Sequence, residues 1–280
     1  MAFVTVGGTA VHTVVDGSGP VCVLAAGLGM AWFDWDPVVE LLAPHRTVVR
    51  FDRPGLGRSA PAPGPPDPAA EADRFGRVLD ALGLTGPATV VGHSLAGFHA
   101  ESFARRHPAR VNALVLLDTS VEERPVPRRP SLALDLAVRA SVTALCRAGV
   151  PYALGPALRR LTIRAGRLGG APDPAPPQLV RAVYRTSRTA RAIAAEHLTH
   201  PEAALYLAAL RRTHALPGGL PVTVLAAARA TGGPDPWLTR QRALAKALSA
   251  RFRVAAPAGH FVMLDRPADV ADAIRAATAR

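Results

Sequence analysis

The chain has 280 residues, of which 49% are hydrophobic and 19% charged, and this balance excludes the composition typical of disordered proteins. A chain of this length buries roughly three quarters of the surface that its unfolded form exposes, so it can build its own core. The net charge of +12 would attract acidic partners, although Lys246 is the only lysine among the 33 basic residues. Neither a lysine-rich run nor zinc-finger spacing accompanies the arginines, which argues against a nucleic-acid-binding protein.

The N-terminal third of the chain gives no sign of a membrane or export segment. Residues 17–33 form its longest uncharged stretch but contain four glycines and a proline, and a membrane helix needs roughly 18 apolar residues. The first residues alternate like a strand and lack a basic segment followed by an apolar one, so we expect a cytoplasmic protein. Cys22 and Cys146 lie far apart and outside any Cys/His cluster, which predicts neither a disulfide framework nor a zinc site.

Eight strands are predicted along the chain. The first two, at 2–6 and 10–15, flank the turn signal Gly7-Gly8 and predict a hairpin. Continuous apolar runs then predict strands buried on both faces, at 21–27, 46–52, 87–94, 111–118, 221–227 and 251–257. Helical patterns separate several of these runs, at 37–42, 69–82 and 95–107. Strands that alternate with helices predict an α/β fold with a mostly parallel sheet.

The segment 120–219 differs from the rest because its strand signals stop and Ala, Arg and Leu recur at helical spacing. We expect an all-helical insertion there, interrupted at Pro151, at 171–177 and at Pro201. The remaining segments, 1–119 and 220–280, would form the core domain. Residues 121–215 contain 15 arginines and six acidic residues, so the insertion carries most of the chain's positive charge.

One junction between a strand and a helix carries the clearest chemical signal. The run ATVVGHSLAGFHA passes from a buried strand through Ser94 into a helix. The corner residue of such a turn adopts a strained backbone, and the residues two before and two after it nearly touch, so both must be small. Gly92 and Ala96 meet that requirement. The turn would expose the Ser94 hydroxyl at the carboxyl edge of the sheet, beside a helix N-terminus that stabilises negative charge.

Five segments together resemble the alpha/beta-hydrolase family over nearly the whole chain. They are LAAGLGM at 24–30, FDRPGLGRS at 51–59, VVGHSLAG at 90–97, RHPARVNALVLLD at 106–118 and AGHFVMLDRPADVADAI at 258–274. The resemblance implies a mostly parallel eight-stranded sheet flanked by helices, with a helical cap inserted between the sixth and seventh strands. Two positions depart from the family pattern. Ala96 replaces the usual glycine two residues after the nucleophile. Ala26 replaces a histidine that often precedes the oxyanion-loop glycine, so other contacts must hold that loop.

The general base that we predict is His260. A serine hydroxyl needs a base to take its proton, and a histidine has the pKa that suits this task near neutrality. His260 follows the last predicted strand, where the carboxyl edge of the sheet would bring it over Ser94. His93 and His99 adjoin the turn at Ser94 and are interpreted as packing or hydrogen-bonding neighbours.

Two aspartates compete for the acid that orients the histidine. Asp118 ends the strand beside the nucleophile strand, a position that some members of the family use, and we favour it. Many relatives instead carry the acid after the strand at 221–227, where the first carboxylate is Asp235. The simpler role of Asp235 is to cap a helix that begins at Pro236.

The remaining site residues follow from their family positions and from their aromatic character. The backbone amides of Leu28 and Leu95 would stabilise the oxyanion. Asp52 and Arg53 are interpreted as a charged pair that braces the following turn. Five aromatic residues could line an apolar acyl pocket, namely Trp32, Phe33, Trp35, Phe98 and Phe261.

The sequence therefore predicts a serine hydrolase that cleaves a carboxylic ester, lactone or thioester of a largely apolar small molecule through an acyl-Ser94 intermediate. This chemistry requires neither a metal nor an organic cofactor. One alternative is an acyltransferase, cyclase or thioesterase, with the basic insertion docking an acyl carrier protein or coenzyme A. Another is a catalytically inactive protein that uses the pocket to bind a ligand.

Overall fold

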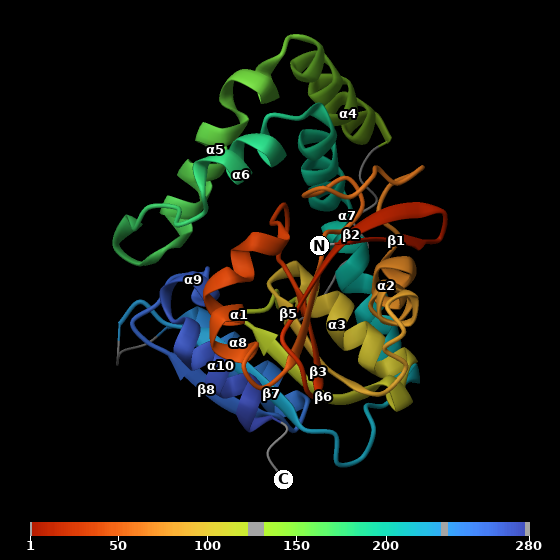
Figure 1. Cartoon of the computed structure of the whole chain (residues 1–280), viewed down its shortest axis with the longest axis vertical. Helices are drawn as coiled ribbons and strands as arrows, with labels where there is room; N and C mark the ends of the chain where they lie inside the picture. The colour runs from red at the N-terminus through yellow and green to blue at the C-terminus, as the bar shows by residue number, and fades with distance from the viewer. Residues whose placement is uncertain (1, 123–131, 231–234, 278–280) are drawn as a thin grey trace.

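The protein folds around one central sheet. The computed structural model describes residues 2–122, 132–230 and 235–277. Within these ranges the strands pair in the order β1-β2-β4-β3-β5-β6-β7-β8 (Figure 1). Their bounds are β1 (Ala2–Val6), β2 (Thr9–Asp16), β3 (Val21–Ala25), β4 (Thr47–Phe51), β5 (Ala88–His93), β6 (Val111–Leu117), β7 (Val222–Ala227) and β8 (Arg251–Ala255). Strands β1 and β2 run antiparallel to their neighbours and the rest are parallel, which confirms the predicted α/β sheet.

Helices cover both faces of the sheet. One face packs against α1 (Asp36–Leu42), α9 (Val262–Asp265) and α10 (Pro267–Ala276). The other face packs against α2 (Pro68–Ala81), α3 (Leu95–Arg106) and α8 (Pro236–Ala247). In β5 the neighbours Val90 and Val91 are both fully buried but belong to opposite core clusters, since successive side chains of a strand point to opposite faces. This two-sided burial explains why the central strands lack polar alternation.

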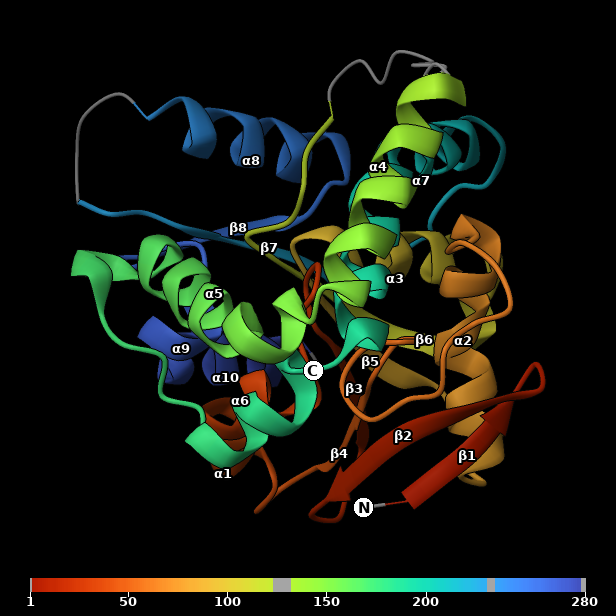
Figure 2. The same ribbon diagram turned by 90° about the horizontal axis from the view of Figure 1, so that it is seen from above.

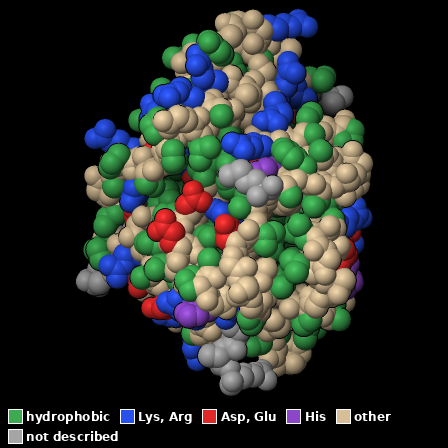
Figure 3. Space-filling model, viewed as in Figure 1, with side chains coloured by type: hydrophobic (Ala, Val, Ile, Leu, Met, Phe, Trp, Pro, Cys, Tyr) green, Lys and Arg blue, Asp and Glu red, His purple; other side chains and the backbone are tan. Residues whose placement is uncertain are grey.

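Between β6 and β7 the regular elements of the described residues are helices, joined by short loops. The α-helices are α4 (Leu132–Arg147), α5 (Val150–Gly166), α6 (Pro177–Tyr184) and α7 (Ser187–Thr213). They lie over the carboxyl edge of the sheet and form a second layer when the molecule is seen from above (Figure 2). Lys and Arg side chains gather on the part of the surface that these helices occupy (Figure 3).

The predicted interruption at Pro201 is wrong, because α7 continues through it. A proline inside a helix removes one backbone hydrogen bond and costs about 3 kcal/mol. Helix α7 packs Ala203, Ala204 and Leu207 against Leu95 at the start of α3, and this buried contact offsets the loss. Pro151 behaves as expected, because it lies in the first turn of α5, where a missing N–H does no harm.

Two further expectations concern cysteines and membranes. Cys22 and Cys146 are unpaired and buried, and burial raises the pKa of the Cys22 thiol to about 12. No helix within the described ranges is both long enough and apolar enough to cross a bilayer. The same ranges hold no group of His, Cys, Asp or Glu side chains arranged to take a metal ion.

Candidate active site

Ser94 occupies the turn between β5 and α3, and its backbone has the strained conformation that the sequence predicts. Its φ of 51° and ψ of −123° lie outside the regions that L-residues favour. Gly92 makes this turn possible, since a Cβ at that position would lie 2.4 Å from the Ala96 carbonyl oxygen. The hydroxyl is half-buried, and Leu95 follows it as the first residue of α3, where backbone N–H groups lack an intrahelical acceptor.

Three side chains from distant segments form one chain of hydrogen bonds. His260 Nε2 lies 3.1 Å from Ser94 Oγ, and His260 Nδ1 lies 2.7 Å from Asp118 Oδ2. With a neutral imidazole, Nδ1–H donates to the carboxylate and Nε2 accepts the serine proton. The second oxygen of Asp118 accepts from the Ala227 amide at 2.9 Å and from the Trp237 indole at 2.6 Å. This arrangement fixes the tautomer and orientation of His260 and leaves Asp118 to stabilise the imidazolium.

Asp235 occupies a different place from Asp118. It caps α8, where its carboxylate accepts from the amides of Trp237 at 2.8 Å and Leu238 at 3.3 Å. This capping holds the N-terminus of the helix that carries Trp237, whose indole contacts Asp118. Within the described ranges, Asp235 is therefore linked to the hydrogen-bond chain only through Trp237, and it makes no hydrogen bond to His260. Residues 231–234, which connect it to β7, lie outside those ranges.

His93 supports the loop that carries His260. Its Nε2 lies 2.9 Å from the His260 carbonyl oxygen, and the ring is fully buried. Burial and the neighbouring His260 hold the pKa of His93 well below its ordinary value, so the ring is neutral and Nε2–H donates to that carbonyl. On its other side the ring fills the space beside Gly27, where a Cβ would lie 2.7 Å from His93 Nδ1. One imidazole thus sets the spacing between the His260 loop and the oxyanion loop.

His99 in α3 is also buried, and we expect it to make stability depend on pH. Burial, opposed by Glu71 and assisted by Arg53 and Arg74, lowers the pKa of His99 to about 4. The unfolded chain therefore binds more protons than the folded one between pH 6.5 and 4, and stability is lost as pH falls through this window. We expect the loss between pH 7 and pH 4.5 to be about 2 kcal/mol, and His99→Gln to remove that share. Urea unfolding at pH 7 and pH 4.5 measures it, and equal pH dependence of the variant and the wild type would contradict the assignment.

The candidate oxyanion loop, which has alanine at position 26, is held by side chains from other segments. Arg53, which follows β4, donates to the Ala26 carbonyl and, at 2.8 Å, to the Gly27 carbonyl. Its guanidinium also pairs with Glu196 of α7, and both side chains are only 5% exposed. Glu196 in turn accepts from the Gly29 amide at 2.9 Å, and the Tyr184 hydroxyl donates to the Gly29 carbonyl at 2.8 Å.

These contacts correct the predicted pairing of Asp52 with Arg53. Asp52 does brace the turn, since it accepts from the Arg58 amide at 3.1 Å and lies 2.7 Å from His12 Nδ1. Arg53 instead turns toward the loop at 26–29 and the insertion. Arg53 and Glu196 are 143 positions apart, and sequence reasoning missed their pairing, since it gave Arg53 another partner and did not single out Glu196.

We expect Glu196→Gln to lower kcat by roughly tenfold to a hundredfold with a smaller change in KM. The variant keeps an acceptor for Gly29 but removes the charge that holds Arg53, so the amides around Leu28 lose their fixed geometry. Steady-state kinetics with an ester substrate measure the effect. Arg211→Gln is the control, because it breaks another ion pair between α7 and the core, to Glu101, away from the loop. If both variants lose stability and neither loses kcat, the role of Glu196 is structural.

An apolar cavity of about 350 Å³ lies between the oxyanion loop and the insertion helices. Leu28 and Phe261 line its core side, and Leu145, Leu158 and Ile163 line its opposite side. The other aromatic candidates do not line it: Trp32 and Phe33 pack against Val180 and Val183 of α6, Phe98 packs against Leu207 of α7, and Trp35 is fully buried among core residues. Of the aromatic residues that the sequence singles out, Phe261 alone contacts this space.

Comparison with known proteins defines the class. A model of the alpha/beta hydrolase family matches residues 22–273, and the chain belongs to this family. The fold is similar to that of Cfl2 from Burkholderia cenocepacia, with 23% identity and a TM-score of 0.76 over 98% of this chain and 94% of that one. It is also similar to the enol-lactonase from Burkholderia xenovorans LB400, with 22% identity and a TM-score of 0.66 over 98% of each chain.

Sequence relatives match shorter stretches. Residues of this chain are 38% identical over 120 positions to the polyketide synthase ThaQ of Burkholderia thailandensis, a match that covers 43% of this chain and 6% of that protein. They are 39% identical over 100 positions to the putative carbamate hydrolase RutD of Caulobacter segnis, covering 35% of this chain and 37% of the relative. The matched region is thus less than half the length of each relative.

Proposed function

We propose that this protein is a serine hydrolase that cleaves a carboxylic ester, lactone or thioester of a largely apolar small molecule. The observation that carries the proposal is the hydrogen-bond chain from Ser94 Oγ through His260 to Asp118. His260 takes the serine proton as Ser94 attacks the carbonyl carbon, and returns it to the leaving group when the tetrahedral intermediate collapses. Water activated by the same histidine then releases the acid from Ser94.

The apolar cavity beside the loop supports the proposed substrate class; Leu28 and Phe261, the neighbour of His260, line it, whereas Ser94 and His260 do not. The amides of Leu28 and Leu95 would bind the oxyanion, and Leu28 also lines the apolar cavity. We propose that the insertion, residues 120–219, acts as a cap and would cover an acyl group in that cavity. The volume of the cavity lies at the small end of the range for ligand pockets, which favours a small acyl group over a large one.

A fluorophosphonate probe and a series of p-nitrophenyl esters test this function. We expect the probe to label the wild-type chain at Ser94, and ester hydrolysis to rise with acyl length and then fall as the cavity is filled. Labelling that persists in Ser94→Ala would place the nucleophile elsewhere. A folded wild-type protein that neither labels nor hydrolyses any ester would instead favour an inactive ligand-binding protein.

Acyl transfer or thioester cleavage from a carrier is the second candidate. The 120-residue similarity to a polyketide synthase favours it, together with the 15 arginines of residues 121–215, which an acidic carrier protein or coenzyme A would complement. The same three side chains would serve, because only the acceptor of the acyl group changes. Trapping acyl-Ser94 and adding water, an alcohol or an amine shows which acceptor receives the acyl group.

A further inference from the structure

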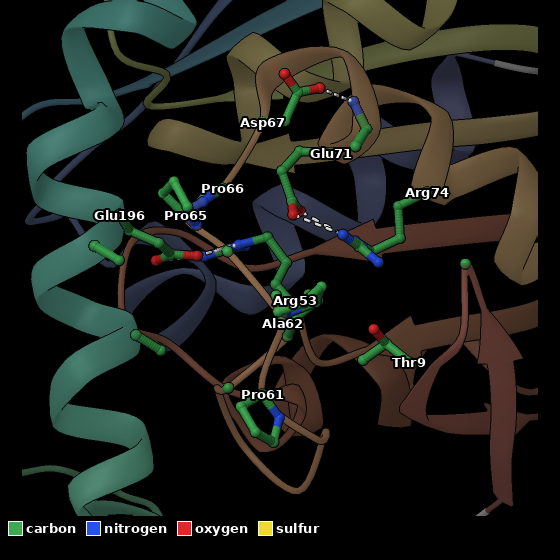
Figure 4. Close-up of a pocket in the computed structure, with 18 of the residues that line it drawn as sticks. Thr9, Arg53, Pro61, Ala62, Pro65, Pro66, Asp67, Glu71, Arg74 and Glu196 are labelled. Atoms are coloured by element: carbon green, nitrogen blue, oxygen red, sulfur yellow. Dashed lines mark hydrogen bonds and ion pairs between the residues drawn. The ribbon is translucent and has the colours of Figure 1, made fainter.

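A second and larger cavity lies on the opposite side of helix α7 from the apolar one. It has a volume of about 890 Å³ and opens between α2, α7, the β1–β2 turn and the proline-rich segment 61–66 (Figure 4). Successive residues of α7 face different cavities. Thr189, Ala190 and Ile193 face the apolar cavity, whereas Arg188 and Arg191 face this one. Helix α7 is thus a shared wall with one apolar and one basic side.

The walls of the second cavity have an excess of positive charge. Their arginines are Arg53, Arg74, Arg77, Arg139, Arg188 and Arg191, and their acidic residues are Asp67, Glu71 and Glu196. Two of the arginines are neutralised where they stand: Arg53 pairs with Glu196, and Arg74 makes two hydrogen bonds to Glu71, at 2.7 and 3.1 Å (Figure 4). Arg77 and Arg139 form longer ion pairs, to Asp73 at 3.7 Å and to Asp135 at 3.8 Å. The excess is therefore centred on Arg188 and Arg191.

Arg188 and Arg191 are the arginines best placed to take an anion. Arg188 is half-buried and donates to two backbone carbonyls, at Ser59 (2.6 Å) and Gly57 (2.5 Å), which leaves three of its five N–H groups. Burial lowers the pKa of Arg188, and the charge of Asp52, which is not within ion-pair distance, opposes this only in part. Within the part of the chain that the structure describes, no carboxylate lies within ion-pair distance of Arg188 or of Arg191, one helical turn further on.

The other features of the cavity are those of a ligand-binding site. Pro61, Pro63, Pro65 and Pro66 form one rim, and their fixed φ angles reduce the entropy lost when that rim is ordered around a ligand. The volume falls within the range of ligand sites, and several guanidinium groups converge on it. A guanidinium matches phosphate oxygens in paired hydrogen bonds, and a polyanion can use more than one such group where a monocarboxylate uses one.

We propose that this cavity binds an organic phosphate or diphosphate, with its phosphate oxygens on Arg188 and Arg191. The site is separate from Ser94 and the apolar cavity, so its binding does not depend on the hydrolase reaction.

Isothermal titration of the full-length chain with inorganic pyrophosphate, coenzyme A and pantetheine tests the proposal. We expect saturable binding of pyrophosphate and coenzyme A, weakening as salt rises, and none of pantetheine, which shares the thiol arm of coenzyme A but lacks phosphate. If coenzyme A binds much more tightly than pyrophosphate, the site recognises the nucleotide-bearing cofactor. Equal affinities would identify the diphosphate group itself. Ser94→Ala should bind like the wild type, which separates this site from the proposed catalytic function.

Variants on α7 localise the site. Arg191→Gln changes an exposed side chain and should weaken coenzyme A binding about tenfold, and the double variant with Arg188→Gln should weaken it further. Arg212→Gln is the matched control, because it removes an exposed arginine of the same helix outside the cavity. The proposal is overturned if pyrophosphate and coenzyme A give no saturable binding, if pantetheine binds as well as coenzyme A, or if Arg212→Gln weakens binding as much as Arg191→Gln does.

Discussion

Replacing Ser94 by alanine should lower kcat on an ester substrate by at least about four powers of ten while leaving the fold unchanged. The hydroxyl is the only atom in the hydrogen-bond chain that can form the acyl bond, and His260 has no second nucleophile within 3.1 Å to activate in the described structure. Binding and oxyanion stabilisation would remain, so the residual rate should still exceed that of the uncatalysed reaction. Single-turnover kinetics with purified wild type and variant measure the difference.

The control for this loss is the melting temperature. Ser94 already has a φ of 51°, and alanine meets the same backbone strain there, so thermal unfolding should change little. A stable Ser94→Ala protein that retains a substantial part of the wild-type rate would remove Ser94 from the mechanism.

Asp118→Asn should have the second largest effect, again of several powers of ten in kcat. All three partners of this carboxylate are donors, namely His260 Nδ1–H, the Ala227 amide and the Trp237 indole. An asparagine offers only one acceptor oxygen, so its NH₂ group must face one of these donors. If it faces His260, the imidazole must carry its proton on Nε2 and cannot accept the serine proton. The lost charge also removes the partner of the imidazolium that forms when Ser94 attacks. Rates across pH 5–9 should stay low, because a higher pH does not restore the tautomer.

Asp235→Asn is the matched comparison, and it should be mild. Asparagine caps a helix about as well as aspartate does, so α8 and the indole of Trp237 would keep their places. Parallel kcat measurements on the two variants, with circular dichroism to check folding, rank the two carboxylates. If Asp235→Asn is the severe variant and Asp118→Asn the mild one, the role of the acid moves to Asp235.

Local signals explain why much of the fold could be predicted. The apolar runs at 87–94 and 111–118 identify their strands because both faces are buried, and the spacing of Gly92 and Ala96 around Ser94 specifies a sharp turn whatever lies elsewhere. The position of His260 beyond the last strand follows from the rule that carboxyl ends of parallel strands share one edge.

The parts that could not be predicted depend on contacts between distant segments. Nothing near Arg53 in the sequence indicates that it bonds to the loop at 26–29 or pairs with Glu196, although the absent histidine at position 26 signals that some substitute must exist. Hydrophobicity could not separate Phe261, which lines the cavity, from Trp32 and Phe33, which pack in the interior, because all three are buried. Pro201 was mispredicted because tertiary packing outweighs a local helix penalty.

In the proposed mechanism, the contacts of the inserted helices with Gly29 make the cap part of the catalytic site. The Gly29 amide is held by Glu196 and its carbonyl by Tyr184, and both side chains belong to the inserted helices. An outward movement of those helices to admit a substrate would release both backbone groups of Gly29 at once. In the proposed mechanism, cleavage would therefore be confined to the closed molecule, because an acyl chain that enters while the helices are open would meet a serine without a formed oxyanion site.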